Sequence, residues 1–255
     1  MQEPWADTST ITDGLDILGF DPFDKLEEGT RYQQPAIFLC SVAAWREADD
    51  TDDVVVAAGH SLGEYAALVA AEVLSFEEAL PLVAERAAAM ADAGDDKPGS
   101  MIAFLGGDDA DIRKLAQALD LTVANDNSPG QLILSGSVDS IEEADATGRD
   151  KTGARTRKLD VSGAFHSPLM EGAAERLASA LDAATFGEPK FPVYSNGTAA
   201  PFADVKAELS ENLLRGVRWR ETLLAMSDDG VDRFIEYGHG AVLTGLVKRT
   251  LGVPA

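Results

Sequence analysis

The sequence predicts an α/β fold in which a core with a parallel sheet carries a small inserted unit. The chain has 255 residues, of which 45% are hydrophobic, enough for one sizeable domain and a smaller one. Residues 53–58 form a short β-branched and apolar run, typical of a parallel strand covered on both faces. Strands and helices follow a different order within 98–161. We therefore expect a core from 1–97 and 162–255, and a small unit from 98–161.

Helical and extended patterns alternate in the first part of the chain. The predicted elements are a helix over 36–46, a strand over 53–58, helices over 64–71 and 75–91, and a linker over 92–99. Gln34-Pro35 opens the first of these helices. Ser75 and Glu78 form a capping box at the start of the third. Residues 1–30 are polar and rich in aspartate, apart from a short apolar patch.

The small unit is predicted from six elements separated by turn residues. They are strand 100–105, helix 109–119, strands 121–125 and 131–135, helix 138–149 and strand 155–161. This β-α-β-β-α-β order is the split βαβ of a ferredoxin-like unit. The α/β pattern then returns, with helix 168–183, strand 191–195, helices near 203–214 and 220–228, strand 233–237 and a helix from Gly240.

Acidic residues dominate the composition: 44 Asp and Glu against 21 Lys and Arg give a formal net charge of −23. Nucleic acids and anionic membranes bind basic surfaces, so we expect neither as a partner. The N-terminus lacks a signal-peptide pattern, and no stretch is long enough to span a bilayer. The single cysteine, Cys40, excludes an internal disulfide and suits a reducing compartment. We therefore expect a cytoplasmic monomer.

A serine between two glycines is the strongest chemical signal in the chain. Gly59-His60-Ser61-Leu62-Gly63 stands where the strand over 53–58 meets the next helix. Such a strand–turn–helix elbow exposes the serine hydroxyl, as in α/β-hydrolase-like cores. The next amide, at Leu62, lies at the helix N-terminus and can donate to an oxyanion. The sequence therefore predicts Ser61 as a nucleophile and Leu62 as half of an oxyanion hole.

Three histidines could serve as the base for Ser61. His60 lies inside the elbow, where its side chain should point away from the serine hydroxyl, so we expect a structural role. His166 stands on a loop after the small unit, and His239 follows the strand over 233–237. Pattern alone favours His239, because hydrolases of this type keep their base after a late strand. A surface or capping role for His239 is an equal alternative.

Arg86 occupies an unusual position on the helix over 75–91. Its neighbours on one helical face are Ala79, Leu82, Val83, Ala87 and Met90. An unpaired charge on such an apolar face is costly, so Arg86 needs an anionic partner. That partner is either a carboxylate of the protein or a substrate carboxylate held by the planar guanidinium. A nucleophilic serine beside this arginine suggests an acyl donor with a free carboxylate.

The elbow sequence through Tyr65 resembles the active-site signature of malonyl-CoA:acyl carrier protein transacylases and of polyketide synthase acyltransferase domains. Other segments that match this family in the same order are Gln34-Pro35-Ala36, Ser41-Val42-Ala43, Arg86, Asn127 to Gln131, Val161 to Ser167, Val217-Arg218-Trp219 and Gly238 to Leu246. Together they span nearly the whole chain. The resemblance implies an α/β-hydrolase-like core with a ferredoxin-like subdomain.

The resemblance also implies a role for each site residue. His166 would be the general base, since the family's histidine lies in the segment matched by Ala164 to Ser167, and position 239 is usually proline. The family has no carboxylate in its dyad, and a backbone carbonyl near Asn212 would orient the imidazole. Arg86 would bind the malonyl carboxylate, and Phe165 is typical of malonyl-selective members. No metal or cofactor is implied.

The implied reaction transfers malonyl from malonyl-CoA, through malonyl-Ser61, to the phosphopantetheine thiol of acyl carrier protein, in fatty acid or polyketide biosynthesis. Carrier proteins are acidic, so docking needs a local basic patch. The richest cluster is Lys151, Arg155, Arg157 and Lys158. An alternative is that these charges only solvate an exposed strand edge.

The N-terminus departs from the family pattern. Family members begin with a strand that ends in Gly-Gln-Gly-Ser-Gln, whose first glutamine supplies the second oxyanion N–H; residues 1–15 contain neither. Losing one such donor typically costs about a hundred- to a thousandfold in rate. Two alternatives therefore stay open: a truncated, weakly active or inactive relative that binds malonyl-CoA or carrier protein, and a serine esterase-like hydrolase that uses Ser61 and His239.

Overall fold

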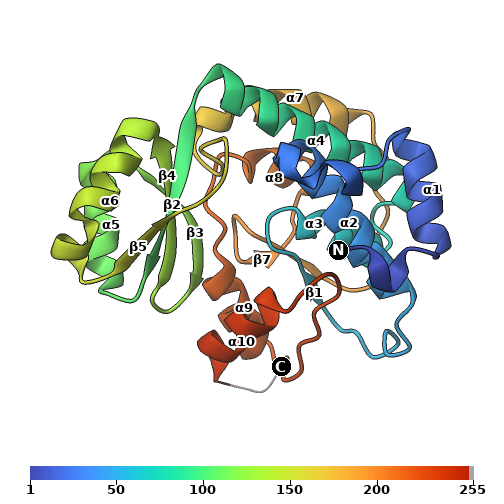
Figure 1. Ribbon diagram of the computed structural model, residues 1–255. Coiled ribbons are helices and arrows are strands. Elements are labelled where there is room, and N and C mark those ends of the chain that lie inside the picture. Colours follow the sequence, from blue (N-terminus) through green and yellow to red (C-terminus); the bar gives the residue numbers. More distant parts are fainter. Residues whose placement is uncertain (253–255) are drawn as a thin grey trace.

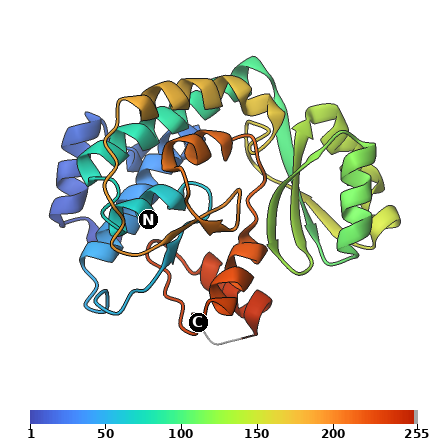
Figure 2. The same ribbon diagram turned by 180° about the vertical axis from the view of Figure 1, so that it is seen from behind.

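The computed structural model describes residues 1–252 and contains two separate β-sheets (Figure 1). One sheet has three strands in the order β1-β6-β7, and the other has four in the order β3-β4-β2-β5. The larger unit is mostly helical, and the four-stranded sheet with its two helices projects to one side of it (Figures 1 and 2). The predicted α/β class is confirmed. Of the helices described, none is long and apolar enough to cross a membrane.

The larger unit is built from helices around a small sheet. Its helices are η1 (Glu3–Trp5), α1 (Ser9–Leu18), η2 (Phe23–Glu28), α2 (Thr30–Arg46), α3 (Gly63–Ala70), α4 (Phe76–Asp96), η3 (Pro168–Met170), α7 (Glu171–Asp182) and α8 (Val205–Glu211), and its strands are β1 (Ala57–Ala58), β6 (Val193–Ser195) and β7 (Ala200–Pro201). Strand β1 runs parallel to β6, and β7 antiparallel to it. The side chains of α2, α3, α4 and α7 form the main hydrophobic core.

Helix α4 confirms one prediction and overturns another. Ser75 caps it as expected, because the Ser75 Oγ accepts a hydrogen bond from the Glu78 N–H at 3.1 Å. The helix continues to Asp96, so the linker predicted over 92–99 is wrong for most of its length. A Cβ on Gly94 would lie 2.6 Å from the Ser162 carbonyl oxygen. Gly94 therefore permits the segment around Ser162 to approach α4 closely, and it does not break the helix.

One helix prediction near the N-terminus needs correction, and one helix was not predicted. Helix α2 begins at Thr30, so Pro35 lies inside it and does not open it. Within residues 1–30, for which the sequence predicted no element, α1 begins after a Thr8 cap and buries Ile11 at 2% exposure. The buried face of α1 has few apolar residues, so the sequence pattern did not indicate a helix. The helix is stabilised by packing against α2 and α4.

Of the two strands predicted at 53–58 and 233–237, the first is much shorter than expected and the second is not formed. Of residues 53–58, only Ala57 and Ala58 (β1) pair with another strand, β6. Val55 is 68% exposed, so this segment is not covered on both faces. Residues 233–237 form no strand. A strand requires a backbone partner, and β1 is an edge strand within the described sheet. The late segment is instead held by side chains: Arg233 and Tyr237 contact Asp50, each at 3.0 Å.

The small unit has the predicted β-α-β-β-α-β order. Its elements are β2 (Gly99–Leu105), α5 (Asp109–Ala118), β3 (Thr122–Ser128), β4 (Gln131–Ser137), α6 (Val138–Thr152) and β5 (Arg155–Lys158). The antiparallel order β3-β4-β2-β5 is consistent with a ferredoxin-like unit. Helices α5 and α6 lie side by side on one face of the sheet (Figures 1 and 2). The domain boundaries at 97/98 and 161/162 stay a prediction.

Strand β3 joins the small unit to the rest of the chain. Its Asp126 N–H donates to the Val217 carbonyl at 2.9 Å, and the Val217 N–H donates to the Ala124 carbonyl at 2.8 Å. After Val217 come α9 (Trp219–Asp228) and α10 (Val242–Leu251), which lie together below the two units in Figure 1. The residues between α8 and α9 thus pass along the junction of the two units, where the candidate site lies.

Candidate active site

The turn that carries Ser61 is strained and held from outside. Ser61 has φ +51°, in the left-handed region that non-glycine residues rarely adopt. Its N–H donates to the Asn196 Oδ1 at 2.6 Å, while the Asn196 Nδ2 donates to the Gly59 carbonyl at 2.6 Å. A Cβ on Gly59 would lie 1.8 Å from the Gly63 carbonyl carbon, so the close packing of this turn requires Gly59. The elbow therefore fixes the Ser61 side chain at the junction.

Ser61 and His166 form a hydrogen-bonded pair. The Ser61 Oγ lies 2.7 Å from the His166 Nε2. On the far side of the ring, the Nδ1 lies 2.8 Å from the Asn212 carbonyl oxygen and 3.1 Å from that of Arg215. A carbonyl oxygen only accepts, so Nδ1 carries the proton and Nε2 is left as the acceptor for the Ser61 hydroxyl.

His166 is buried as a neutral base. It is 4% exposed, and burial together with the nearby Arg86 charge lowers the pKa of His166 to about 3. A neutral imidazole that accepts the Ser61 proton has the form that general-base catalysis requires.

Arg86 lies against the same hydroxyl. Its Nη2 donates to the Ser61 Oγ at 2.9 Å, and its Nη1 donates to the Gln34 Oε1. Both partners are neutral, and burial lowers the pKa of this 4% exposed arginine. The Tyr65 ring centroid lies 6.0 Å from the guanidinium carbon. No carboxylate of the described residues forms an ion pair with Arg86, and Glu64 acts on it without a hydrogen bond. The guanidinium is therefore able to hold a substrate anion.

The other predicted residues occupy distinct places. Leu62 is 8% exposed and forms the N-cap of α3, so its N–H lies at the positive end of that helix beside Ser61. The His60 Nε2 lies 2.8 Å from the Asn127 Oδ1, and its ring packs on Trp219. His60 thus ties the elbow to β3. His239 is exposed on the loop before α10, and it is not among the hydrogen-bond partners of the Ser61 hydroxyl.

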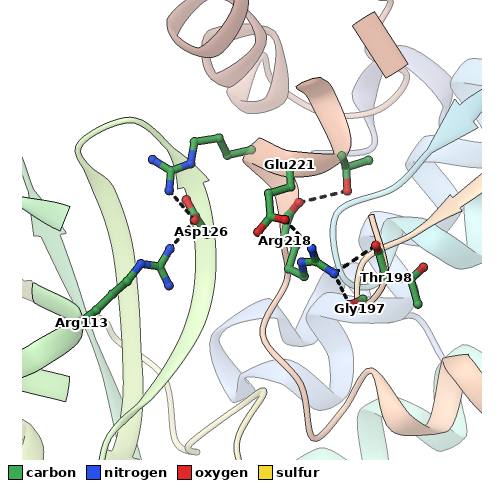
Figure 3. Close-up of polar contacts among 8 residues, drawn as sticks. Arg113, Asp126, Gly197, Thr198, Arg218 and Glu221 are labelled. Atoms are coloured by element: carbon green, nitrogen blue, oxygen red, sulfur yellow. Dashed lines mark hydrogen bonds and ion pairs between the residues drawn. The ribbon is translucent and has the colours of Figure 1, made fainter. Parts of the chain in front are cut away.

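Segment 212–218, which presents carbonyls to His166, is anchored to both units. Arg218 donates to the Gly197 carbonyl at 3.2 Å and to the Thr198 carbonyl at 3.0 Å (Figure 3). On the side of the small unit, Asp126 accepts from Arg113 of α5 (Figure 3) and also from Arg220 of α9. The position of the histidine ring therefore depends on contacts from both units.

Sequence patterns missed three residues of this site. Gln34 holds Arg86, Asn196 holds the Ser61 amide, and Glu64 lies buried beneath both asparagines of the site. Gln34 belongs to a segment that matches the family, although nothing in its spacing singles it out. Asn196 directly follows β6, and polar residues at the carboxyl end of a parallel strand are a general signal of a site.

The four predicted basic residues are all exposed, but they face different ways. The Lys158 Nζ pairs with Glu142 of α6 at 2.7 Å, so Lys158 lies on the helix-covered face of the sheet. Arg157 pairs across strands with Ala103, and Arg155 with Leu105. Cross-strand partners share a face, and Ala103 belongs to a cluster that includes Phe165, the neighbour of His166. Arg155 and Arg157 therefore lie on the face of the sheet that carries Phe165.

Comparisons with known proteins agree on one family. Residues 15–253 match the family model of the acyl transferase domain. The malonyl CoA-acyl carrier protein transacylase of Bacillus subtilis is 39% identical over 227 residues, which cover 85% of this chain and 71% of that protein. The Salmonella typhimurium transacylase is 36% identical over 94% of this chain and 83% of its own.

Solved structures give the same result. The MCAT of Streptococcus pneumoniae superposes with a TM-score of 0.91 at 34% identity, covering all of this chain and 89% of that one. A malonyl-transacylase solved in complex with a type II polyketide acyl-carrier protein gives 0.91 at 33% identity, over 100% and 89% of the two chains. With its serine elbow, its fold and most of its length matched, the chain belongs to the acyltransferase family that contains the malonyl-CoA:acyl carrier protein transacylases.

Proposed function

We propose that the protein transfers a malonyl group from malonyl-CoA to the phosphopantetheine thiol of acyl carrier protein through a malonyl ester of Ser61. One observation carries the proposal: the Ser61 Oγ is within hydrogen-bond distance of both the His166 Nε2, at 2.7 Å, and the Arg86 guanidinium, at 2.9 Å. A base activates the hydroxyl, and a cation beside it favours an acyl group that ends in a carboxylate.

The first half of the reaction loads Ser61. His166 removes the hydroxyl proton as the Ser61 Oγ attacks the thioester carbon, and the negative charge develops on the former carbonyl oxygen. The Leu62 N–H donates to that oxygen. When the tetrahedral intermediate collapses, the carbon–sulfur bond breaks, and the protonated His166 returns the proton to the CoA thiolate.

The second half repeats these steps with a new nucleophile. The carrier-protein thiol gives its proton to His166 and attacks the malonyl ester, and the Ser61 oxygen leaves and takes the proton back. These steps use no metal or cofactor, because the nucleophile, the base and the oxyanion donor all belong to the chain. Burial raises the pKa of the Cys40 thiol to about 11, so this thiol is a poor nucleophile. A chain with a single cysteine suits a reducing compartment, and we place the protein in the cytoplasm.

The choice of acyl donor rests on Arg86. In malonyl-Ser61 a single methylene separates the free carboxylate from the ester carbonyl. The carboxylate is therefore close enough for a guanidinium that already reaches the Ser61 Oγ. Gln34 accepts a hydrogen bond from the Nη1 of Arg86 and so limits its rotation. Phe165, packed in the cluster with Met101 and Ala103, adds bulk beside His166. Together these contacts support selection of malonyl over acetyl and over branched donors.

Arg155 and Arg157 are the best supported docking residues for an acidic carrier protein. Both are exposed on the face that carries Phe165, whereas Lys158 is engaged by Glu142 on the other face. In a chain with a net charge of −23, an acidic partner approaches only where cations are concentrated locally. Lys151 lies at the end of α6 and is a less direct candidate.

A slow transacylase, or a relative that binds without turnover, is the second candidate. Residues 3–5 and 9–18 form η1 and α1, so the described N-terminal segment holds no counterpart of the family's strand and second oxyanion donor. The chain covers 71% of the Bacillus subtilis relative. A site in which one amide donates to the oxyanion is expected to be about a hundred- to a thousandfold slower than a site with two donors.

Mass spectrometry after incubation with malonyl-CoA tests the proposal. We expect a malonyl adduct on Ser61 that is absent in Ser61→Ala and that disappears when carrier protein is added. Binding of malonyl-CoA without an adduct would favour the second candidate. Release of free malonate with no transfer would favour a hydrolase, and loss of turnover in His239→Ala but not in His166→Ala would refute the assigned base.

A further inference from the structure

A carboxyl group is buried three residues after Ser61. Glu64, on the first turn of α3, is 2% exposed. Its Oε1 accepts from the Asn196 N–H at 2.7 Å and from the Asn212 Nδ2 at 2.9 Å, and its Oε2 lies 3.1 Å from the same Nδ2. All these donors are neutral amides. Arg86 acts on Glu64 electrostatically but gives it no hydrogen bond. A buried carboxyl group whose hydrogen bonds all come from neutral groups is costly, and an apolar side chain would fill the space at lower cost.

One of the two asparagines holds the serine. Asn196 is 1% exposed, and its backbone N–H is the group that donates to Glu64. Its side chain holds the Ser61 N–H and the Gly59 carbonyl, each at 2.6 Å. Because Ser61 has φ +51°, its backbone needs such external hydrogen bonds to stay in place.

The other asparagine holds the histidine. The Asn212 carbonyl accepts from the His166 Nδ1 at 2.8 Å, and the Asn212 side chain donates to Glu64 and to the Ser195 Oγ, the latter at 3.3 Å. A Cβ on Gly197 would lie 2.3 Å from the Asn212 Oδ1, so the amide is also confined on its far side. The rotation of Asn212 is thereby fixed, and with it the direction of its carbonyl.

We propose that Glu64 is a positioning residue for the Ser61–His166 pair, which it fixes at both ends: the serine turn through Asn196 and the imidazole through Asn212. It touches neither the Ser61 Oγ nor the His166 ring. In many hydrolases a carboxylate is hydrogen-bonded directly to the histidine. In this chain Asn212 lies between the carboxyl group of Glu64 and the His166 ring. The inference rests on the proposed function only in that both use this dyad.

Four variants and a matched control test the proposal. Glu64→Ala leaves two buried donors unpaired, and we expect kcat for malonyl transfer to fall about 10- to 100-fold with KM within about threefold. Glu64→Gln keeps the shape, and the Oε1 of the glutamine can still accept from both the Asn196 N–H and the Asn212 Nδ2, so we expect kcat within about fivefold of the parent. Asn212→Ala keeps the carbonyl and removes only the amide, and should match Glu64→Ala. The double variant should lose no more than either single one.

Glu208 supplies the control. It is also a buried glutamate, 8% exposed, that accepts from two backbone amides, of Ala203 and Asp204 at 2.8 and 3.1 Å. Its side chain has no hydrogen bond to Asn196 or Asn212, although its charge acts on Glu64 and its backbone carbonyl accepts from the Asn212 N–H at 2.8 Å. We expect Glu208→Ala to lower the melting temperature and leave kcat within about twofold. Equal losses of kcat in Glu208→Ala and Glu64→Ala would overturn the proposal, because both losses would then reflect general destabilisation.

Two measurements keep the test separate from the identity of the substrate. The rate at which a fluorophosphonate labels Ser61 depends on the dyad and not on malonyl-CoA, and it should fall in Glu64→Ala as kcat does. The low-field proton resonance of the His166 Nδ1–H, assigned by its loss in His166→Ala, should shift or broaden. An unchanged labelling rate and resonance in folded Glu64→Ala would refute the inference. If Glu64→Ala does not fold, Asn212→Ala carries the same test.

Discussion

The Arg86 guanidinium donates to the Ser61 Oγ at 2.9 Å, although the two residues stand on different elements, α4 and the elbow before α3. Among the described residues, Arg86 is the only charged group with a hydrogen bond to this hydroxyl. The contact places the guanidinium where an acyl group would be attached. Its other partner, Gln34, is neutral. A cation buried without an anion is costly, and a substrate carboxylate would offset that cost.

Arg86→Ala should change the choice of acyl donor. We expect kcat/KM for malonyl-CoA to fall about 100-fold, since two charge-assisted hydrogen bonds are lost, and kcat/KM for acetyl-CoA to change less than about fivefold. Arg86→Lys, which keeps the charge without the planar fork, should lie between them. The measurement is transfer of radiolabelled malonyl and acetyl groups to carrier protein. An unchanged ratio of the two donors would contradict the role assigned to Arg86.

Loading of Ser61 should stay active in mild acid. His166 acts as a base only when neutral, and burial with the Arg86 charge lowers its pKa from 6.5 to about 3. We therefore expect kcat/KM for the loading step to show no fall as pH decreases through 6.5. Single-turnover formation of the Ser61 adduct between pH 4.5 and 8 measures this. A half-maximal rate near pH 6.5 would mean that His166 is solvated like a free histidine.

The small unit was predictable because its signals are local. Its β3–β4 hairpin turns at Pro129 and Gly130, and α5 begins directly after the capping residue Asp108. The core strands were harder, because β1 pairs with β6, whose residues lie more than 130 positions away. The run at 233–237 has strand composition but finds no backbone partner among the described residues. Composition alone does not reveal whether a partner exists.

The residues of the site also fall into those that local patterns predict and those that depend on distant contacts. Ser61 and Leu62 follow from the turn pattern, and Arg86 follows from a charge on an apolar helix face. The choice of His166 over His239 came only from the family resemblance, since both histidines follow plausible loops. Glu64 and Asn196 were not recognised, because the contact that gives them meaning joins residues 132 positions apart.

Glu64 should make the stability of the protein depend on pH in a specific direction. Burial raises the pKa of Glu64 from 4.5 to about 8 in the folded protein. Between these values the folded state binds more protons than the unfolded state, so this group lowers the free energy of unfolding as pH rises. Glu64→Gln removes that dependence. We expect the variant to gain stability relative to the parent from pH 5 to pH 8, in urea unfolding.

His166 changes the free energy of unfolding with pH in the opposite direction to Glu64, so both proteins compared must contain it. Its folded pKa is lowered, so its contribution rises with pH between about 3 and 6.5, but it is present in both proteins and cancels in the comparison. Glu208, whose charge also raises the pKa of Glu64, is likewise left unchanged in both proteins. Parallel stability curves for parent and Glu64→Gln would show that Glu64 is ionised in the folded protein as readily as in the unfolded chain.

The last prediction concerns the face on which Arg155 and Arg157 lie. Reversing both charges, Arg155→Glu with Arg157→Glu, should raise KM for carrier protein about tenfold, because an acidic partner then meets a surface of its own sign. Loading of Ser61 by malonyl-CoA, a small-molecule step, should be unchanged. The matched control is Lys158→Glu, since Lys158 is on the same strand but pairs with Glu142 on the opposite face of the sheet. Raising the salt to about 1 M should remove most of the difference, because exposed charges are then screened beyond about 3 Å. If Lys158→Glu weakened the transfer step as much as the double variant, the carrier protein would be responding to net charge and not to this face.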